Sequence, residues 1–347
     1  MDIQSTSIPV AHRSPVLLAG GAATASAATR SRYCRATAGG GQRLGAAASA
    51  FVRSAVVRAG DYLTLMKPRV MSLVVFTAAV GLLSAPGGVK PATGLLAILF
   101  IAAGAGAAAI LNMWYDADID AVMARTSDRP IPQGRVRPGE ALALGLALAA
   151  AAVALLGWSS NVAAAALLAV TIGVYILVYT VWLKRASPHN IVIGGVAGAF
   201  PPMIGWAAAT GAVSLESLLL VLIIFLWTPP HFWALSLYRT DDYARAAVPM
   251  LPVVAGAART SEQIFVYTLL LVLVSLLPCA LGFAGPVYGA VAATAGGHML
   301  LLAWRLRVAC GAAKRIARRL FTFSIAYLFS LFAAYLTGKL LAAHFAN

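Results

Sequence analysis

Three polar residues at the end of a long apolar run have the types and the spacing of a cation site. Asn112, Asp116 and Asp120 lie four residues apart, so at about 100° per residue they share one face of a helix. Two carboxylates and an amide oxygen suit a hard divalent ion such as Mg²⁺, which keeps some waters and binds a phosphorylated substrate. Asp118 is turned about 200° from Asp116 and is not expected to join them. The alternative, a solvated loop with weak ion pairs, is less favoured for three polar groups in helical register at membrane depth.

Cationic side chains follow this triad and end another apolar run. Four arginines after the triad supply positive charge for a bound anion: Arg125, Arg129, Arg135 and Arg137. Lys184 and Arg185 close the run that begins near residue 162. They either extend toward water from a membrane helix or bind phosphate as well, and the clustering of ligand-like groups at helix ends favours binding.

The composition is that of a membrane protein. The 347 residues are 61% hydrophobic and 11% charged, whereas soluble domains contain roughly 45–50% and 25%. The sequence predicts an all-α, polytopic fold of nine transmembrane helices, each close to the roughly 20 residues that a bilayer requires. The predicted spans are 70–86, 92–115, 141–158, 162–183, 190–210, 215–236, 264–284, 286–305 and 320–343.

Lysine and arginine are distributed unequally between the two sides of this predicted bundle. With the N-terminus inside, the inner connections carry 19 of them and the outer connections carry two, Lys90 and Lys339. Cytoplasmic connections collect positive charge, so the pattern predicts that the N-terminus and both acidic loops face the cytoplasm. It also explains the net charge of +15 without a nucleic-acid partner, for which no motif is present.

Residues 1–54 differ in composition from the rest and are predicted to form a disordered N-terminal extension. They are rich in Ala, Gly, Ser and Arg, with Asp2 as the only acid, and cannot bury a core. An acid-poor, Arg-containing segment is also typical of an organellar transit peptide. We favour a bacterial extension, because an Ala- and Arg-rich bias runs through the whole chain, and predict that residues 55–347 form one transmembrane domain.

A second polar group follows the sixth predicted span. Asp241 and Asp242 either help to hold a second cation or cap the helix in water. Asp242 is the better candidate because it lies four residues after Tyr238, on the same face of a continuous helix. Within the span, Pro229 and Pro230 remove backbone donors, which predicts a kink beside a cavity.

Aromatic residues and a histidine lie near the same helix end. His231 either ligates iron or packs as a hydrogen-bonded core residue, the more common role of a lone histidine among aromatic rings. Trp227, Trp233, Tyr238 and Tyr243 either belong to an interfacial belt or form the walls of a pocket that stabilises a carbocation. The belt is the default interpretation, and the residues alone leave both open.

These stretches resemble the protoheme IX farnesyltransferases, the heme-modifying branch of the UbiA prenyltransferase superfamily. The resemblance covers about residues 60–340. The Asn-x-x-x-Asp-x-x-x-Asp spacing is shared across the superfamily, and the heme branch is indicated by Lys67-Pro-Arg69, Arg129-Pro-Ile-Pro, Tyr179-Thr-x-x-Leu-Lys184-Arg185, Asn190-Ile-Val-Ile-Gly-Gly and Pro229-Pro-His231-Phe-Trp233. One departure is Ala247, where the family has glycine; a backbone that needs positive φ there would disfavour alanine.

The resemblance implies a reaction and the residues that carry it. Farnesyl diphosphate and heme B would give heme O and diphosphate, with water added at the former vinyl carbon, and heme O would pass to a downstream heme A synthase. Mg²⁺ would be held by Asn112, Asp116 and Asp120, joined by Asp242. The diphosphate would be bound by Lys67, Arg125, Arg129, Lys184 and Arg185, and the heme or the cation by His231, Trp233, Tyr238 and Tyr243.

Two other functions are compatible with parts of this pattern. A UbiA-type enzyme that prenylates a quinone precursor or another aromatic ring would use the same triad, and prenylation of 4-hydroxybenzoate without heme O would identify it. A transporter would place ionisable residues and broken helices near the membrane midplane, whereas these acids cluster at one surface. The expected location is the bacterial inner (cell) membrane, in preference to the mitochondrial inner membrane.

Overall fold

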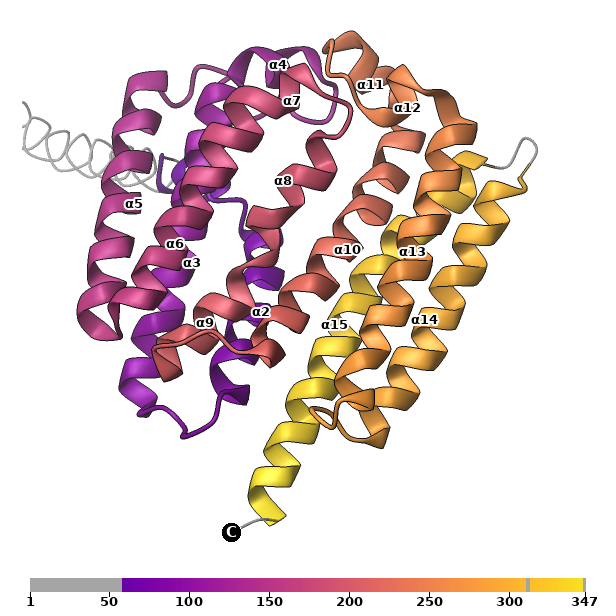
Figure 1. The fold of residues 1–347 in the computed structure, drawn as a ribbon. Coiled ribbons are helices and arrows are strands. Elements are labelled where there is room, and N and C mark those ends of the chain that lie inside the picture. Colours follow the sequence, from indigo (N-terminus) through magenta and orange to yellow (C-terminus); the bar gives the residue numbers. More distant parts are fainter. Residues whose placement is uncertain (1–57, 310–312, 346–347) are drawn as a thin grey trace, which may run out of the picture. The chain divides into compact units, whose positions relative to one another are not determined.

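The computed structural model describes residues 58–309 and 313–345, and within them the chain is helical and contains no β-strand (Figure 1). These residues belong to one compact unit, Arg58–Asn347. The all-α class predicted from the sequence is confirmed. The predicted disordered extension, residues 1–54, lies outside the described residues.

Long apolar helices make up most of the described chain. A helix at Arg58–Leu65 is followed, after a bend of 52°, by α2. The further bounds are α2 Pro68–Ser84, α3 Pro91–Tyr115, α4 Ala117–Val122, α5 Pro138–Ser159, α6 Val162–Gly173, η1 Val174–Leu183, α7 Lys184–Ala186, α8 Asn190–Ala199, α9 Pro201–Thr210, α10 Leu215–Tyr238, α11 Thr240–Arg245, α12 Leu251–Val254, α13 Gly256–Ala280, α14 Pro286–Arg307 and α15 Ala313–Phe345. Among the described residues, eight segments can span a membrane, or nine if Arg58–Leu65 and α2 form one bent span. The chain is therefore a polytopic membrane protein, as its composition predicts.

Two helices begin at least two turns, about seven residues, before their predicted spans. α13 begins at Gly256 and α15 at Ala313, against predicted starts of 264 and 320. The added turns carry charged side chains such as Arg259, Glu262 and Arg318, which favour helix but not burial in lipid. Hydropathy therefore marks the apolar part of each helix and misses the turns that extend beyond it.

α10 forms the centre of the bundle. It contacts α8, α9, α13 and α15, is the most buried of the candidate spans, and continues as one helix through Pro229 and Pro230. α5 and the segment Val162–Ala186 are the least buried; they expose large side chains such as Trp158 and Trp182, as helices facing lipid do. The short helices α4, α7, α11 and α12 lie at one end of the bundle (Figure 1). Both acidic loops are therefore on the same side.

α2 and α9 approach each other through two glycines. A Cβ atom on Gly81 would lie 1.9 Å from the carbonyl oxygen of Pro202, and one on Gly205 would lie 2.0 Å from the carbonyl oxygen of Ala78. Both contacts are with backbone, which has no side-chain rotamer to move. Small residues allow this close approach of membrane helices, and the contact holds α2 in place behind Lys67.

We expect Gly205→Ala to destabilise the protein by about 1–3 kcal/mol, the usual effect of overpacking, because the added methyl group pushes α9 away from α2. Gly198→Ala is the matched control: no heavy atom lies within 4 Å of the added Cβ, and alanine is the better helix former. Thermal unfolding in detergent, followed by tryptophan fluorescence, compares the two variants. Equal melting temperatures would contradict the close backbone contact.

Candidate functional site

Asn112, Asp116 and Asp120 have the helical register that their spacing predicts. Asn112 lies in the last turn of α3, and the Asp116 amide donates to its carbonyl oxygen at 3.0 Å. A turn at Asp116 ends α3, but the Asp120 amide in α4 donates to the Asp116 carbonyl oxygen at 2.8 Å. The helical hydrogen-bond pattern thus continues across the break, and all three side chains are buried.

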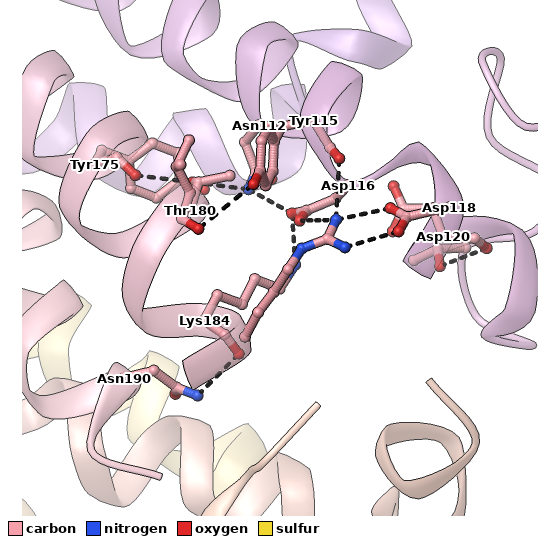
Figure 2. A network of polar contacts seen from close by, with 12 residues as sticks. Asn112, Tyr115, Asp116, Asp118, Asp120, Tyr175, Thr180, Lys184 and Asn190 are labelled. Atoms are coloured by element: carbon pink, nitrogen blue, oxygen red, sulfur yellow. Dashed lines mark hydrogen bonds and ion pairs between the residues drawn. The ribbon is translucent and has the colours of Figure 1, made fainter. Parts of the chain in front are cut away.

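The Asn112 and Asp116 side chains contact each other directly. The Asn112 amide nitrogen donates to Asp116 Oδ2 at 2.7 Å (Figure 2), and the Asn112 oxygen accepts from Lys67 Nζ at 2.8 Å. In the described part of the chain, no hydrogen bond joins the Asp120 carboxylate to either residue. Lys67 has a left-handed backbone, with φ 53°, directly before Pro68. Residues other than glycine rarely adopt this conformation, and such strained positions concentrate at functional sites.

Both buried aspartates are paired with cations. Lys184 Nζ lies 2.5 Å from Asp116 Oδ2, and Arg129 Nη1 lies 2.6 Å from Asp120 Oδ2. The Asp116 and Asp120 side chains are 1% and 4% exposed, so each carboxylate depends on its partner for charge compensation. Asp116 Oδ1 accepts no hydrogen bond from the described residues, and the Arg185 guanidinium is 3.9 Å away. The hydrogen-bonding capacity of this buried oxygen is therefore unused among the described residues.

A π-helical segment brings Lys184 to Asp116. η1 follows α6 without a break, and π-helices, in which hydrogen bonds reach back five residues, are rare and frequent at functional sites. The Thr180 hydroxyl donates to the Tyr175 carbonyl oxygen at 2.8 Å and accepts from the Asn112 amide at 3.1 Å (Figure 2). Thr180 belongs to the Tyr179-Thr-x-x-Leu-Lys184-Arg185 stretch of the resemblance, but one threonine in an apolar span does not by itself indicate a site residue.

Asn190 is a second residue of the site that spacing alone does not indicate. It is fully buried at the start of α8, and its amide nitrogen lies 3.5 Å from the Lys184 carbonyl oxygen (Figure 2). Its side-chain oxygen has no hydrogen-bond partner among the described residues. Its signals in the sequence are an amide that opens an otherwise apolar helix and its place in the Asn190-Ile-Val-Ile-Gly-Gly stretch of the resemblance. Buried polar atoms without a partner are unusual, and this one adds an acceptor near Lys184.

Asp118 lies apart from the triad, as its position in the helix predicts. Its side chain is 64% exposed and accepts two hydrogen bonds of 2.7 Å from the Arg185 guanidinium. These hydrogen bonds hold the pKa of Asp118 below its usual value, against the opposing effect of burial. Arg185 also lies over the Tyr115 ring, 4.9 Å from its centre. Arg185 therefore forms the border between the buried triad and water.

The second acidic loop differs from its prediction. α10 ends at Tyr238 and a separate helix, α11, begins at Thr240, so Asp242 does not share a continuous helix with Tyr238. Arg239, with φ −121° and ψ 22°, interrupts the helix between them. Asp242 is buried and pairs with Arg245 and, at 3.9 Å, with Arg239. Its counter-charges therefore come from its own loop.

The two loops lie within electrostatic reach of each other. Burial raises the pKa of Tyr243, and the positive charge of Arg125 opposes this rise. A pocket of about 380 Å³ lies between α4, α7 and the segment that follows α11. Its lining residues are Asp118, Ile119, Val122, Arg185, Arg245, Ala246, Ala247 and Val248. An anionic ligand in this pocket would meet arginines from both sides.

The aromatic residues predicted for a heme or cation pocket do not form one wall. His231 and Tyr238 both contact Phe321 of α15, with ring centres 4.6 and 5.9 Å apart. Trp233 is buried edge-on against Tyr267 of α13, at 5.4 Å between ring centres. His231 and Tyr238 thus share a surface from which Trp233 is turned away.

Ala247 has a positive φ, a conformation that is unfavourable for alanine. This is the position at which the sequence departs from the glycine of the resemblance. Its φ of 52° lies in the left-handed region, which costs an L-residue roughly 1–2 kcal/mol. We expect Ala247→Gly to raise the free energy of unfolding by about 0.5–1 kcal/mol, with activity little changed. Ala246→Gly, at φ −83°, is the control and should bring no gain. Chemical denaturation in detergent compares the two variants. A lower free energy of unfolding in both would show that the Ala247 backbone is not strained.

The donor set suits a divalent cation whose shell is completed by substrate and water. Within the described residues, no group of three or more His, Cys, Asp or Glu side chains could hold a metal ion. Two buried carboxylates and an amide instead form an oxygen-based set, in which Asp116 Oδ1 accepts no hydrogen bond from the described residues. Mg²⁺ uses donors of this kind together with phosphates. Lys184 and Arg129 balance the charges of these carboxylates.

Comparison with known proteins identifies the family. The UbiA prenyltransferase family matches residues 73–342. A protein of Azorhizobium caulinodans named protoheme IX farnesyltransferase is 62% identical over 283 residues, which cover 81% of this chain and 92% of that one. A solved structure of digeranylgeranylglyceryl phosphate synthase has a TM-score of 0.68 at 17% identity, over 81% of this chain and 98% of that one. A UbiA homolog from Archaeoglobus fulgidus bound to DMAPP and Mg²⁺ has a TM-score of 0.58 at 15% identity, over 80% and 99%.

The fold and the polar groups at one end of the bundle define the class of protein, and the matches define its family. The chain is a polytopic helical membrane protein with buried, cation-paired carboxylates at one end of its bundle. It belongs to the UbiA prenyltransferase family, which confirms the resemblance seen in its motifs. The two solved structures share its fold.

Proposed function

We propose that this chain transfers the farnesyl group of farnesyl diphosphate to a vinyl group of heme B, with addition of water, and so produces heme O and diphosphate. The relative from Azorhizobium caulinodans carries the name of this activity. The observation that carries the proposal is the buried contact of Asn112 with Asp116, bordered by Lys67 and Lys184. Carboxylate, amide and ammonium groups meet there at the end of an apolar bundle, where a lipid diphosphate would place its charged group.

The polar end of the bundle has the charges that a diphosphate requires. Lys67, Lys184 and Arg129 contact the triad, and Arg185 borders it. Each contact is with a group that would bind the metal. Arg125 lies within electrostatic reach of Tyr243 in the second loop. When the substrate arrives with its cation, the carboxylates would turn to the metal and the lysines and arginines to phosphate oxygens, with which they form charge-assisted hydrogen bonds.

Mg²⁺ is the cation we propose for Asn112, Asp116 and Asp120. The UbiA homolog from Archaeoglobus fulgidus is bound to DMAPP and Mg²⁺, and the oxygen donors here suit the same ion. When bound, it supplies positive charge against the diphosphate leaving group. Asp242 remains the candidate for a second cation, although its two arginines already balance its charge.

The reaction requires no protein nucleophile. The bond between farnesyl C1 and the diphosphate oxygen breaks, with the electron pair going to oxygen, and the terminal vinyl carbon of the heme captures the allylic cation. Water then adds to the inner vinyl carbon and releases a proton. The apolar helices would hold the isoprenoid and keep bulk water from the first cation, and the rings beside His231 offer faces that attract positive charge.

We further propose that the site faces the cytoplasm in a bacterial inner membrane. This orientation places 19 lysines and arginines in the inner connections and two in the outer ones. The short helices that carry the acids lie together at one end of the bundle (Figure 1). The product would then pass to a downstream heme A synthase in the same membrane.

Purified protein in detergent tests the assignment. With Mg²⁺, farnesyl diphosphate and heme B, we expect heme O by mass spectrometry, and none when EDTA replaces Mg²⁺. With 4-hydroxybenzoate as the acceptor, we expect no prenylated product. Prenylated benzoate without heme O would contradict the proposal and identify a quinone-type prenyltransferase.

A further inference from the structure

Aromatic rings cover both faces of the His231 imidazole. His231 lies in α10 and is 7% exposed. The Trp227 ring stacks on it with centres 4.2 Å apart and an interplanar angle of 20°, and the Phe321 ring of α15 does so at 4.6 Å and 28°. Two rings cannot stack on the same face at these distances, so each covers one face. Phe232 stands edge-on at 5.2 Å. Only an edge of the imidazole is left for a ligand.

The hydrogen bonds around His231 determine which ring nitrogen carries the proton. Nδ1 lies 2.7 Å from Ser324 Oγ, and the same hydroxyl donates to the Phe321 carbonyl oxygen at 2.7 Å. A serine hydroxyl has one proton. Because that proton goes to the carbonyl oxygen, Ser324 Oγ must accept from Nδ1–H. The imidazole is therefore neutral with its proton on Nδ1, and Nε2 presents a lone pair.

The Nε2 lone pair has no protein partner among the described residues, although its side chain is more than nine-tenths buried. His231 lies seven residues before Tyr238, the last residue of α10, which places it about 10 Å along the helix from the polar end. Its neighbours are the rings named above. A basic nitrogen such as His231 Nε2, surrounded by apolar and aromatic side chains, can bind a metal ion that is already held in an apolar organic ligand.

We propose that His231 Nε2 ligates the iron of the substrate heme, an inference that rests on the proposed function. A neutral imidazole whose Nδ1–H is held by a hydrogen bond is the form that binds iron through Nε2. Because both faces are covered, the porphyrin can approach only along the lone pair, with its plane across the imidazole edge. Iron also protects a nucleophilic nitrogen that an allylic cation would alkylate. His231 is a positioning residue that orients the vinyl group toward farnesyl C1.

Heme binding by the purified full-length protein tests this assignment. Ferric heme B is titrated into the protein in lipid nanodiscs without farnesyl diphosphate, and absorption and EPR spectra report the iron ligands. We expect a histidine-ligated spectrum for the wild type. His231→Ala should lose it and bind heme more than about 100-fold more weakly, beyond the usual effect of losing a residue that only supports a ligand. Added imidazole should restore the spectrum.

Two further variants separate ligation from packing. Ser324→Ala removes the acceptor of Nδ1–H but keeps Nε2, so we expect a histidine-ligated spectrum with about tenfold weaker heme binding. His298→Ala removes an exposed histidine of α14 whose ring contacts Phe323 of α15 at 4.5 Å. This variant should leave both the spectrum and the affinity unchanged.

An unchanged iron spectrum in His231→Ala would overturn the proposal even if the wild type makes heme O. A His231→Ala protein that keeps the spectrum but forms a farnesylated product lacking the hydroxyl would also overturn it, and would make His231 a base for the added water. Failure of the proposed function is a different result, in which the wild type alkylates another acceptor and makes no heme O.

Discussion

Asp116→Asn should lower the rate of heme O formation by at least about 10³-fold while the protein still accumulates in the membrane. The carboxylate is 1% exposed, and one of its oxygens accepts no hydrogen bond from the described residues. Asparagine keeps its shape but removes the negative charge that a divalent cation requires. Lys184 loses its partner, but its side chain is 17% exposed, so its ammonium group can reach water at small cost.

The same substitution two residues later is the matched control. Asp118 is 64% exposed and pairs with Arg185, and an exposed pair contributes only about 0–1 kcal/mol. Asp118→Asn should therefore retain activity to within about fivefold. Heme O per amount of membrane protein, measured by mass spectrometry, compares both variants with the wild type. If Asp116→Asn and Asp118→Asn lost heme O formation equally, burial would not distinguish the two aspartates, and this result would contradict a cation site at Asp116.

Lys184→Met should destabilise the protein by roughly 3–5 kcal/mol, the usual effect of removing one partner of a buried ion pair. Methionine keeps the apolar stem of lysine and removes the ammonium that lies 2.5 Å from Asp116 Oδ2. A carboxylate with 1% exposure then keeps only the Asn112 amide and the Arg185 guanidinium, 3.9 Å away, and loses its nearest positive charge. Activity should fall as well, because the same ammonium is proposed to bind the diphosphate.

Mg²⁺ and a second substitution should each reverse the loss of stability. A ligand at 100 times its dissociation constant stabilises a protein by about 2.7 kcal/mol, so Lys184→Met should gain more from Mg²⁺ than the wild type does. The double variant Asp116→Asn/Lys184→Met removes both charges and should recover most of the stability, without activity and without a response to Mg²⁺. Arg135→Met breaks a more exposed pair with Asp61 and should lose at most about 1 kcal/mol. A Lys184→Met protein with wild-type stability would contradict the buried pair.

Patterns local in the sequence predicted much of the fold. Apolar runs near 20 residues long predicted the spans. The four-residue spacing predicted the helical register of Asn112, Asp116 and Asp120, which the backbone hydrogen bonds retain across the turn between α3 and α4. The family pattern also pointed to Ala247 as a residue in an unfavourable conformation, and its φ is positive. In each case the physical cause acts within one helix or one turn.

Contacts between distant segments could not be predicted in the same way. Lys184 reaches Asp116 across 68 residues, and only the packing of the π-helical η1 beside α3 places Thr180 next to Asn112. No residue in η1 distinguishes it from an ordinary α-helix. Asp242 was expected to share a helix with Tyr238, but the backbone of Arg239 interrupts that helix. These features depend on how helices pack, which periodicity and propensity do not report.

Binding of Mn²⁺, a paramagnetic substitute for Mg²⁺, tests the cation site most directly. EPR spectra are recorded for the purified protein with Mn²⁺ and farnesyl thiodiphosphate, an analogue that ionises slowly. We predict bound Mn²⁺ with hyperfine coupling to phosphorus in the wild type and in Asp118→Asn, and its loss in Asp116→Asn and Asp120→Asn. Mn²⁺ bound with unchanged affinity and phosphorus coupling in both Asp116→Asn and Asp120→Asn would show that these carboxylates do not hold the cation.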